Sequence, residues 1–184
     1  MRREIVILSR SLPHHGLGGM EAVAWDLAVE FVRLKYPVRV ITTAIPGENR
    51  EFQQEGIRIV PLEGTTPGCY SRIWWKKSRQ YFLENCMSST LGVLSVSAAA
   101  FSLLVIKKDL PNVSFVMQAH GTSWGEVISK WKSKRLRSWL SSTRNLLWLP
   151  KDIYAYHKFD AVVAVGEKVR HDLTSFPLKW VVSK

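Results

Sequence analysis

Short apolar runs that alternate with segments of helical periodicity constrain the fold of this chain more than any other feature. The runs are Ile5–Leu8, Val38–Thr43, Ile57–Leu62, Gly92–Val96, Ser114–Gln118 and Ala161–Val165, with Trp180–Ser183 as a further candidate. Most are apolar on both faces, which is typical of parallel strands covered by helices on both sides. Helices are predicted over residues 20–35, 72–86, 98–108, 125–149 and 167–173. This alternation predicts a doubly wound α/β fold with a mostly parallel sheet.

The net charge and the cysteines restrict the partners and the compartment. The 184 residues carry a formal net charge of +11, which favours an acidic partner such as nucleic acid, anionic lipid or a phosphorylated ligand. Cys69 and Cys86 match no metal-binding spacing and are predicted to be free thiols in a reducing compartment. Met1–Glu4 runs straight into the first strand without a signal peptide, and the longest apolar run, Leu91–Ile106, is shorter than the roughly 20 residues of a membrane span. We therefore expect a cytoplasmic location.

A glycine-rich stretch, His14–Glu21, follows the first predicted strand and opens the first predicted helix. It lacks the third glycine of the dinucleotide-binding fingerprint, where Glu21 stands, and it contains no Gly-Lys-Ser/Thr of a triphosphate-binding loop. Gly18 and Gly19 can bring backbone N–H groups close to a phosphate or diphosphate at the positive end of the helix. A tight turn that binds nothing explains the same residues equally well.

Several stretches together resemble the N-terminal domain of family 4 glycosyltransferases, which are retaining enzymes of the GT-B fold with two Rossmann-like domains. They are Gly18–Glu21, Asp26–Ala28, Val38–Thr42, Ser114–Gly121 with its final His-Gly pair, and Phe159–Glu167. The resemblance spans nearly the whole chain. It implies that residues 1–184 form the N-terminal, acceptor-side Rossmann-like domain. The C-terminal domain, which in the family holds most of the nucleotide-sugar site, is expected to be absent from the chain.

The resemblance implies transfer of a sugar from a nucleotide-sugar donor to an acceptor with retention of the anomeric configuration. The expected acceptor is lipid-linked or is a polysaccharide or glycan precursor, as in cell envelope polysaccharide biosynthesis. Neither a metal nor another cofactor is expected. Residues 1–184 alone are expected to be inactive, because half of the donor site would be missing.

The resemblance also assigns roles to individual residues. Gly18 and Gly19 are expected to bind the donor diphosphate, because fixed backbone donors stabilise developing charge without reorganisation. His120 follows a strand at the carboxyl edge of the sheet, where doubly wound folds place ligands, and is the expected catalytic residue against the donor sugar. A buried turn histidine is the alternative. Ser95 and Ser97 are candidates for the acceptor side, although structural serines are as common.

Residues 127–150 combine positive charge with tryptophan and contain no acid. Wound as a helix, they place basic residues on one side and most apolar residues on the other, which is typical of an interfacial helix on anionic lipid. A solvated helix packed on its own domain is the alternative. The membrane-binding candidates are Lys130, Trp131, Lys134, Arg137, Trp139 and Arg144. They would place the protein at the inner face of the cell membrane, as a peripheral membrane protein.

Two other functions compete with the glycosyltransferase hypothesis. The first is a non-catalytic Rossmann-like module that docks on an anionic membrane or a protein partner through the basic helix. The second is a nucleic-acid-binding domain. Nucleic acid is not expected, because single-strand binding needs aromatic residues interleaved with basic ones on one exposed platform. In residues 127–150 most aromatic residues fall on the apolar side.

Overall fold

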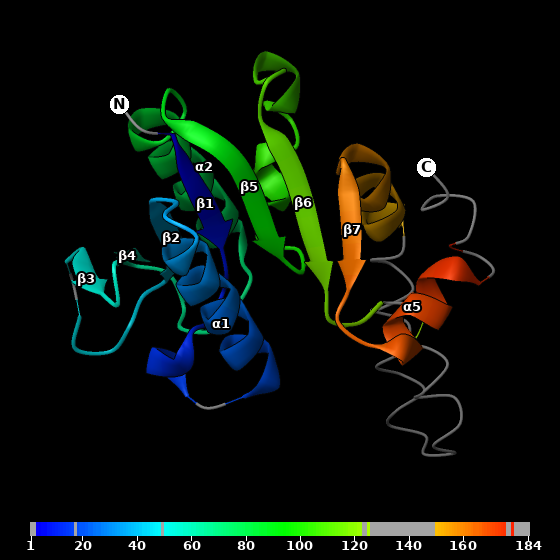
Figure 1. Cartoon of the computed structure of the whole chain (residues 1–184), viewed down its shortest axis with the longest axis horizontal. Helices are drawn as coiled ribbons and strands as arrows, with labels where there is room; N and C mark the ends of the chain where they lie inside the picture. Colours follow the sequence, from blue (N-terminus) through cyan, green and yellow to red (C-terminus); the bar gives the residue numbers. More distant parts are fainter. Residues whose placement is uncertain are drawn as a thin grey trace. The chain divides into compact units, whose positions relative to one another are not determined.

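The computed structural model describes residues 3–16, 18–48, 50–122, 125, 150–175 and 178. The chain divides into two compact units, Met1–Val116 and Met117–Lys184. The strand order is β3-β4-β2-β1-β5-β6-β7 (Figure 1). The first unit contains the strands from β3 to the start of β6, and the second contains the end of β6 and β7.

The six strands predicted between Ile5 and Val165 and three of the five predicted helices are confirmed. The strands are β1 (Glu4–Leu8), β2 (Val38–Thr43), β3 (Phe52–Gln54), β4 (Ile57–Leu62), β5 (Thr90–Val96), β6 (Ser114–Ala119) and β7 (Ala161–Ala164). The helices with described bounds are α1 (Gly19–Arg33), α2 (Arg72–Asn85) and α5 (Glu167–Thr174), and residues 150–158 are also helical. The sequence pattern missed β3, which is short and mostly exposed. The helix predicted over 125–149 and the strand predicted over Trp180–Ser183 lie outside the described residues.

Parallel pairing dominates the first unit. The central strand β1 pairs in parallel with both β2 and β5, so that Ile7 lies beside Val40 on one side and Leu94 on the other. Strand β2 also pairs in parallel with β4, and only β3 runs antiparallel to its neighbour β4. The prediction of a doubly wound, mostly parallel α/β sheet is therefore confirmed.

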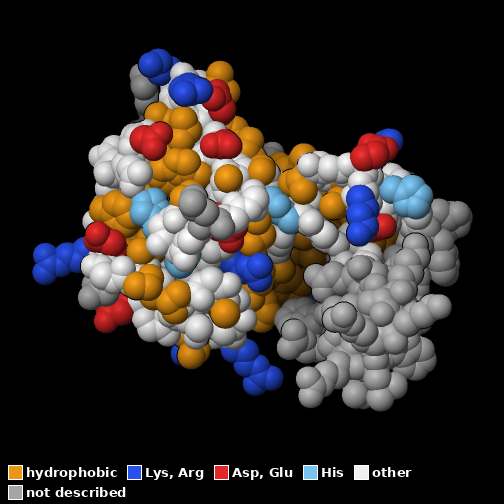
Figure 2. All heavy atoms as spheres, turned by 90° about the horizontal axis from the view of Figure 1, so that it is seen from below, with side chains coloured by type: hydrophobic (Ala, Val, Ile, Leu, Met, Phe, Trp, Pro, Cys, Tyr) orange, Lys and Arg blue, Asp and Glu red, His pale blue; other side chains and the backbone are white. Residues whose placement is uncertain are grey.

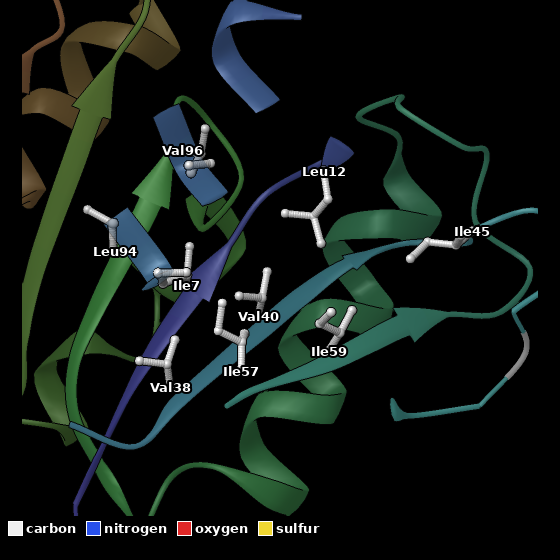
Figure 3. Close-up of a cluster of buried hydrophobic side chains, with 11 residues drawn as sticks. Ile7, Leu12, Val38, Val40, Ile45, Ile57, Ile59, Leu94 and Val96 are labelled. Atoms are coloured by element: carbon white, nitrogen blue, oxygen red, sulfur yellow. The ribbon is translucent and has the colours of Figure 1, made fainter. Parts of the chain in front are cut away.

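Both faces of this sheet are covered by helices (Figure 1). On one face, apolar strand side chains meet α1, which contributes the fully covered small residues Ala24 and Ala28. Figure 3 shows the strand side chains of this cluster, including Ile7, Val40 and Ile59. On the other face α2 buries Trp74 and Phe82 completely. Apolar covering on both faces explains why the strands lack the alternating pattern of half-exposed strands.

The predicted helix over 98–108 is wrong. The chain instead makes two short 3-10 turns, η2 (Phe101–Leu103) and η3 (Lys107–Asp109). The indole N–H groups of Trp74 and Trp75 donate to the carbonyls of Ala99 and Ala98, at 3.2 and 3.3 Å. Because these contacts hold the two carbonyls against α2, the segment satisfies its backbone groups through long-range contacts and short turns.

The described part of the second unit contains the end of β6, the strand β7 and two helical segments. The backbone N–H of Val165 donates to the carbonyl of Ala119 at 3.2 Å, which joins the end of β7 to β6. Helix α5 begins after Gly166 and buries Val169 and Leu173. Among the described residues, no helix is long and apolar enough to cross a membrane.

Candidate functional site

The glycine-rich loop forms the N-terminus of α1. Gly18 is the N-cap residue, in extended conformation, and Gly19 begins the helix; within the described chain no side chain caps this end. A Cβ atom on Gly18 would lie 2.3 Å from Oε2 of Glu21, whereas a Cβ on Gly19 would meet no atom within 4 Å. The Glu21 side chain therefore folds back over Gly18, and Gly19 faces open space. The first turn of α1 presents backbone N–H groups that the helix itself does not use.

A chain of hydrogen bonds ties the end of β1 to this first helical turn. The Ser9 hydroxyl donates to the carbonyl of Ser11 at 2.6 Å, and the Ser11 hydroxyl donates to Oε1 of Glu21 at 2.5 Å. Glu21 is the residue that stands where dinucleotide-binding loops have their third glycine. The structure gives it a structural role, because its carboxylate orients the turn that presents Gly18 and Gly19.

The two adjacent histidines point to different elements. Nδ1 of His15 accepts from the N–H of Leu12 at 3.1 Å, so Nε2 carries the proton that faces the carbonyl of Ala44 at 3.1 Å. Nε2 of His14 lies 2.8 Å from Oε1 of Gln54, and the His14 ring packs edge-on against Trp25. Within the described residues, no group of three His, Cys, Asp or Glu side chains lies close enough to hold a metal ion.

The segment between β4 and α2 packs against the end of β1. The Thr43 hydroxyl, at the end of β2, donates to the carbonyl of Arg10 at 2.5 Å and accepts from the N–H of Gly68 at 2.9 Å. The Tyr70 hydroxyl donates to the carbonyl of Val96 at 2.6 Å, and burial raises the pKa of this phenol. The guanidinium of Arg10 lies 5.2 Å from the centre of the Tyr70 ring. The strand arrows in Figure 1 point toward the face seen in Figure 2, on which histidine, Lys/Arg and Asp/Glu side chains lie among hydrophobic and neutral ones.

Sequence reasoning missed Arg10 and Tyr70. The available signal for Arg10 was its place directly after the first strand, at the carboxyl edge where ligands bind in this fold class. No local signal pointed to Tyr70, because its contact with Arg10 joins segments far apart in the chain.

The two predicted acceptor-side serines differ in their surroundings. Ser95 is fully buried; its hydroxyl donates to the carbonyl of Ser97 at 2.6 Å and accepts from the N–H of Ala100 at 2.9 Å. Ser97 is half-buried, has a left-handed backbone (φ 52°), and directs its hydroxyl toward the Met20 sulfur at 3.9 Å. The structure thus brings Ser97 to Met20 in the first turn of α1 and places Ser95 within the turn after β5. Contact of either serine with an acceptor stays a prediction.

His120 directly follows β6 and belongs to the second unit. It is half-buried, and its Nε2 lies 3.1 Å from Oε1 of Gln118. The nearby Thr122 hydroxyl accepts from the N–H of Gly125 at 2.8 Å, which shapes the turn after the strand. The catalytic role of His120 stays a prediction. The membrane-binding candidates Lys130, Trp131, Lys134, Arg137, Trp139 and Arg144 lie outside the described residues.

Comparisons with known proteins agree with this architecture. The family model for Glycosyltransferase Family 4 matches residues 17–182. A solved sucrose-phosphate synthase from Thermosynechococcus elongatus has a TM-score of 0.64 at 11% sequence identity, over 100% of this chain and 46% of that chain. A second structure of a sucrose-phosphate synthase from the same organism has a TM-score of 0.63 at 10% identity, over 98% of this chain and 83% of that chain. At such identities the likeness shows the fold alone. No curated protein matches the chain.

Proposed function

The chain belongs to glycosyltransferase family 4, and from this premise we propose that it forms the acceptor-side, N-terminal domain of a retaining glycosyltransferase. The reaction is transfer of a sugar from a nucleotide-sugar donor to a lipid-linked acceptor or a glycan precursor. The observation that supports the proposal most directly is the open space in front of Gly19 at the start of α1. The chain spans about half the length of the first sucrose-phosphate synthase (46%), so a second domain is proposed to supply the rest of the donor site.

The backbone at the start of α1 is suited to a departing diphosphate. The N–H groups of its first turn and the helix dipole favour negative charge at this end. They are held in place by the helix and by the bond from Ser11 to Glu21, so they need not reorganise as charge develops on the leaving group. The Glu21 carboxylate is turned back over Gly18, which leaves the approach to Gly19 open.

The proposed role of His120 is to contact the reacting sugar of the donor. An imidazole that also contacts Gln118 has a fixed ring orientation, which is what a group that stabilises a transition state requires. Ser97 is the better acceptor-side candidate of the two serines, because Ser95 uses its hydroxyl within its own turn. Neither a metal nor a cofactor enters the proposed reaction.

The proposed location is the cytoplasmic face of an anionic membrane. The net charge of +11 favours such a surface, and the candidates between residues 130 and 144 would mediate the contact. The competing function, a non-catalytic docking module, predicts the same membrane binding but no affinity for nucleotides.

The test is a transfer assay with a panel of nucleotide sugars and lipid-linked acceptors. The chain by itself is expected to show no transfer, and the active enzyme that contains it is expected to release a product with the anomeric configuration of the donor. NMR of the new glycosidic bond reads that configuration. Inversion would contradict the retaining mechanism, and rapid turnover by the chain alone would contradict the shared donor site.

A further inference from the structure

Arg10 is a half-buried arginine that no carboxylate in the described part of the chain neutralises. Among the described arginines, only Arg10 and Arg39 are not exposed. The guanidinium of Arg39 forms a buried ion pair with Glu4, at 3.0 Å between Nη2 and Oε1. The guanidinium of Arg10 has no hydrogen bond or ion pair to any described residue. Because withdrawing an arginine from water without an anion is unfavourable, its placement calls for an explanation.

An aromatic stack holds the Arg10 side chain. The guanidinium lies over Tyr70, whose ring is parallel to that of Trp75 (interplanar angle 12°, ring centres 6.3 Å apart). Trp75 in turn contacts Phe101, with ring centres 6.1 Å apart. At the other end, the hydroxyl of Thr43 fixes the Arg10 backbone. A guanidinium that rests on a ring keeps its N–H donors available, since these point outward in its plane.

This stack lies on the α2 side of the sheet, because Trp75 belongs to α2. Gly19 begins α1, which covers the opposite face (Figure 1). The helices that support the cation and the glycine turn therefore lie on opposite faces of the sheet, while the Ser11 hydroxyl, in the residue after Arg10, contacts Glu21 in the first turn of α1. Because its support comes from the α2 side, the Arg10 cation is available to an anionic group other than the one that faces Gly19.

We propose that Arg10 binds an oxyanion, a phosphate or a carboxylate, carried by the acceptor. The forked N–H groups of arginine match the two oxygens of such a group, and charge-assisted pairs of this type are the stronger hydrogen bonds. Tyr70 orients the fork before the ligand arrives. Assignment to the acceptor rests on the proposed function, whereas the oxyanion site itself depends only on Arg10 and its stack.

The test titrates inorganic phosphate and acetate into the isotope-labelled chain while the side-chain Nε–H resonance of Arg10 is followed by NMR. Saturable shifts of this resonance are expected with at least one of the two anions, and their comparison tells phosphate from carboxylate. Arg10→Gln should weaken binding about tenfold or more, as expected for a lost bond to a charged group. Tyr70→Leu should weaken it less, and Tyr70→Phe should preserve it, because the ring remains.

Arg72→Gln is the matched control, since Arg72 is exposed at the start of α2 and its loss changes the net charge equally. The oxyanion site is refuted if neither anion shifts the Arg10 resonance, or if Arg72→Gln weakens binding as much as Arg10→Gln.

A titration with UDP and GDP separates the oxyanion proposal from the diphosphate proposal. If Arg10→Gln weakens these nucleotides but not phosphate, Arg10 belongs to the donor site and the acceptor assignment is wrong. If phosphate binding depends on Arg10 while UDP and GDP binding is indifferent to Gly19→Val, the diphosphate proposal fails and the oxyanion site stands.

Discussion

Replacement of Gly19 by valine separates the fold of the glycine loop from its proposed ligand. A Cβ at this position meets no atom within 4 Å, and the residue begins a helix, so the new side chain fits without a clash. Valine has a slightly better helix propensity than glycine, by at most about 0.5 kcal/mol. For a chain of this size that free energy moves the melting temperature by only about 1–2 °C. The fold is therefore expected to be unaffected.

The same valine should obstruct a diphosphate that approaches the first helical turn. Its branched side chain would fill the open space beside Gly19 through which the proposed ligand approaches. The loss of one hydrogen bond to a charged group costs about 1.5–3 kcal/mol, which corresponds to roughly 10- to 100-fold weaker binding. The expected result is a normal melting curve with strongly reduced affinity for UDP or GDP.

Gly18→Ala is the matched control, because its effect should fall on the fold. A Cβ on Gly18 would lie 2.3 Å from Oε2 of Glu21, so the carboxylate must move, and its bond from Ser11 is expected to weaken. The expected cost is about 0.5–1.5 kcal/mol of unfolding free energy. Thermal unfolding and calorimetric nucleotide titration of both variants decide the matter. Normal nucleotide affinity in stable Gly19→Val would show that the loop is only a turn, and a large drop in its melting temperature would contradict the open space.

Further predictions concern catalysis, pH and membranes. In the active enzyme, His120→Ala should lower kcat by orders of magnitude; a loss confined to KM would indicate uniform binding instead. Burial raises the pKa of the Cys86 thiol to about 11, so folding favours the protonated form. The contribution of the buried Cys86 thiol to the free energy of unfolding should be complete below the ordinary thiol pKa and should fall as pH rises toward about 11. The free energy of unfolding from urea titrations should therefore depend less on pH in Cys86→Ala than in the unsubstituted protein. An equal pH dependence in both proteins would contradict this role of Cys86. Vesicles of anionic lipid should bind the chain and release it with rising salt, at about 1 kcal/mol per basic residue. Equal binding to zwitterionic vesicles would contradict membrane binding through the predicted basic helix. Undiminished binding after Lys130, Lys134, Arg137 and Arg144 are all replaced by glutamine would contradict it too.

The strands, α1 and α2 were predictable because their signals are local. Ile5–Leu8 and Val38–Thr43 are apolar on both faces, which only a covered sheet accommodates, and Met20–Lys35 repeats its apolar residues at helical spacing. The position of Gly18 and Gly19 between a strand and a helix was readable for the same reason. A loop of this kind can be recognised from the order of strand, glycines and helix along the sequence alone.

Tertiary contacts decided the rest, because each outcome depends on partners that are distant in sequence. Residues 98–108 have a helical pattern, but the indoles of Trp74 and Trp75 hold their first carbonyls and the segment makes 3-10 turns instead. The positions of the two serines in the sequence also did not show that the Ser95 hydroxyl bonds within its own turn while the Ser97 hydroxyl faces Met20. Nothing in the sequence distinguished Arg10 from a surface arginine, because its contact with the Tyr70 ring forms only in the folded chain. A one-dimensional pattern records the periodicity of burial, whereas a hydrogen bond or a stacked ring requires the position of both partners in space.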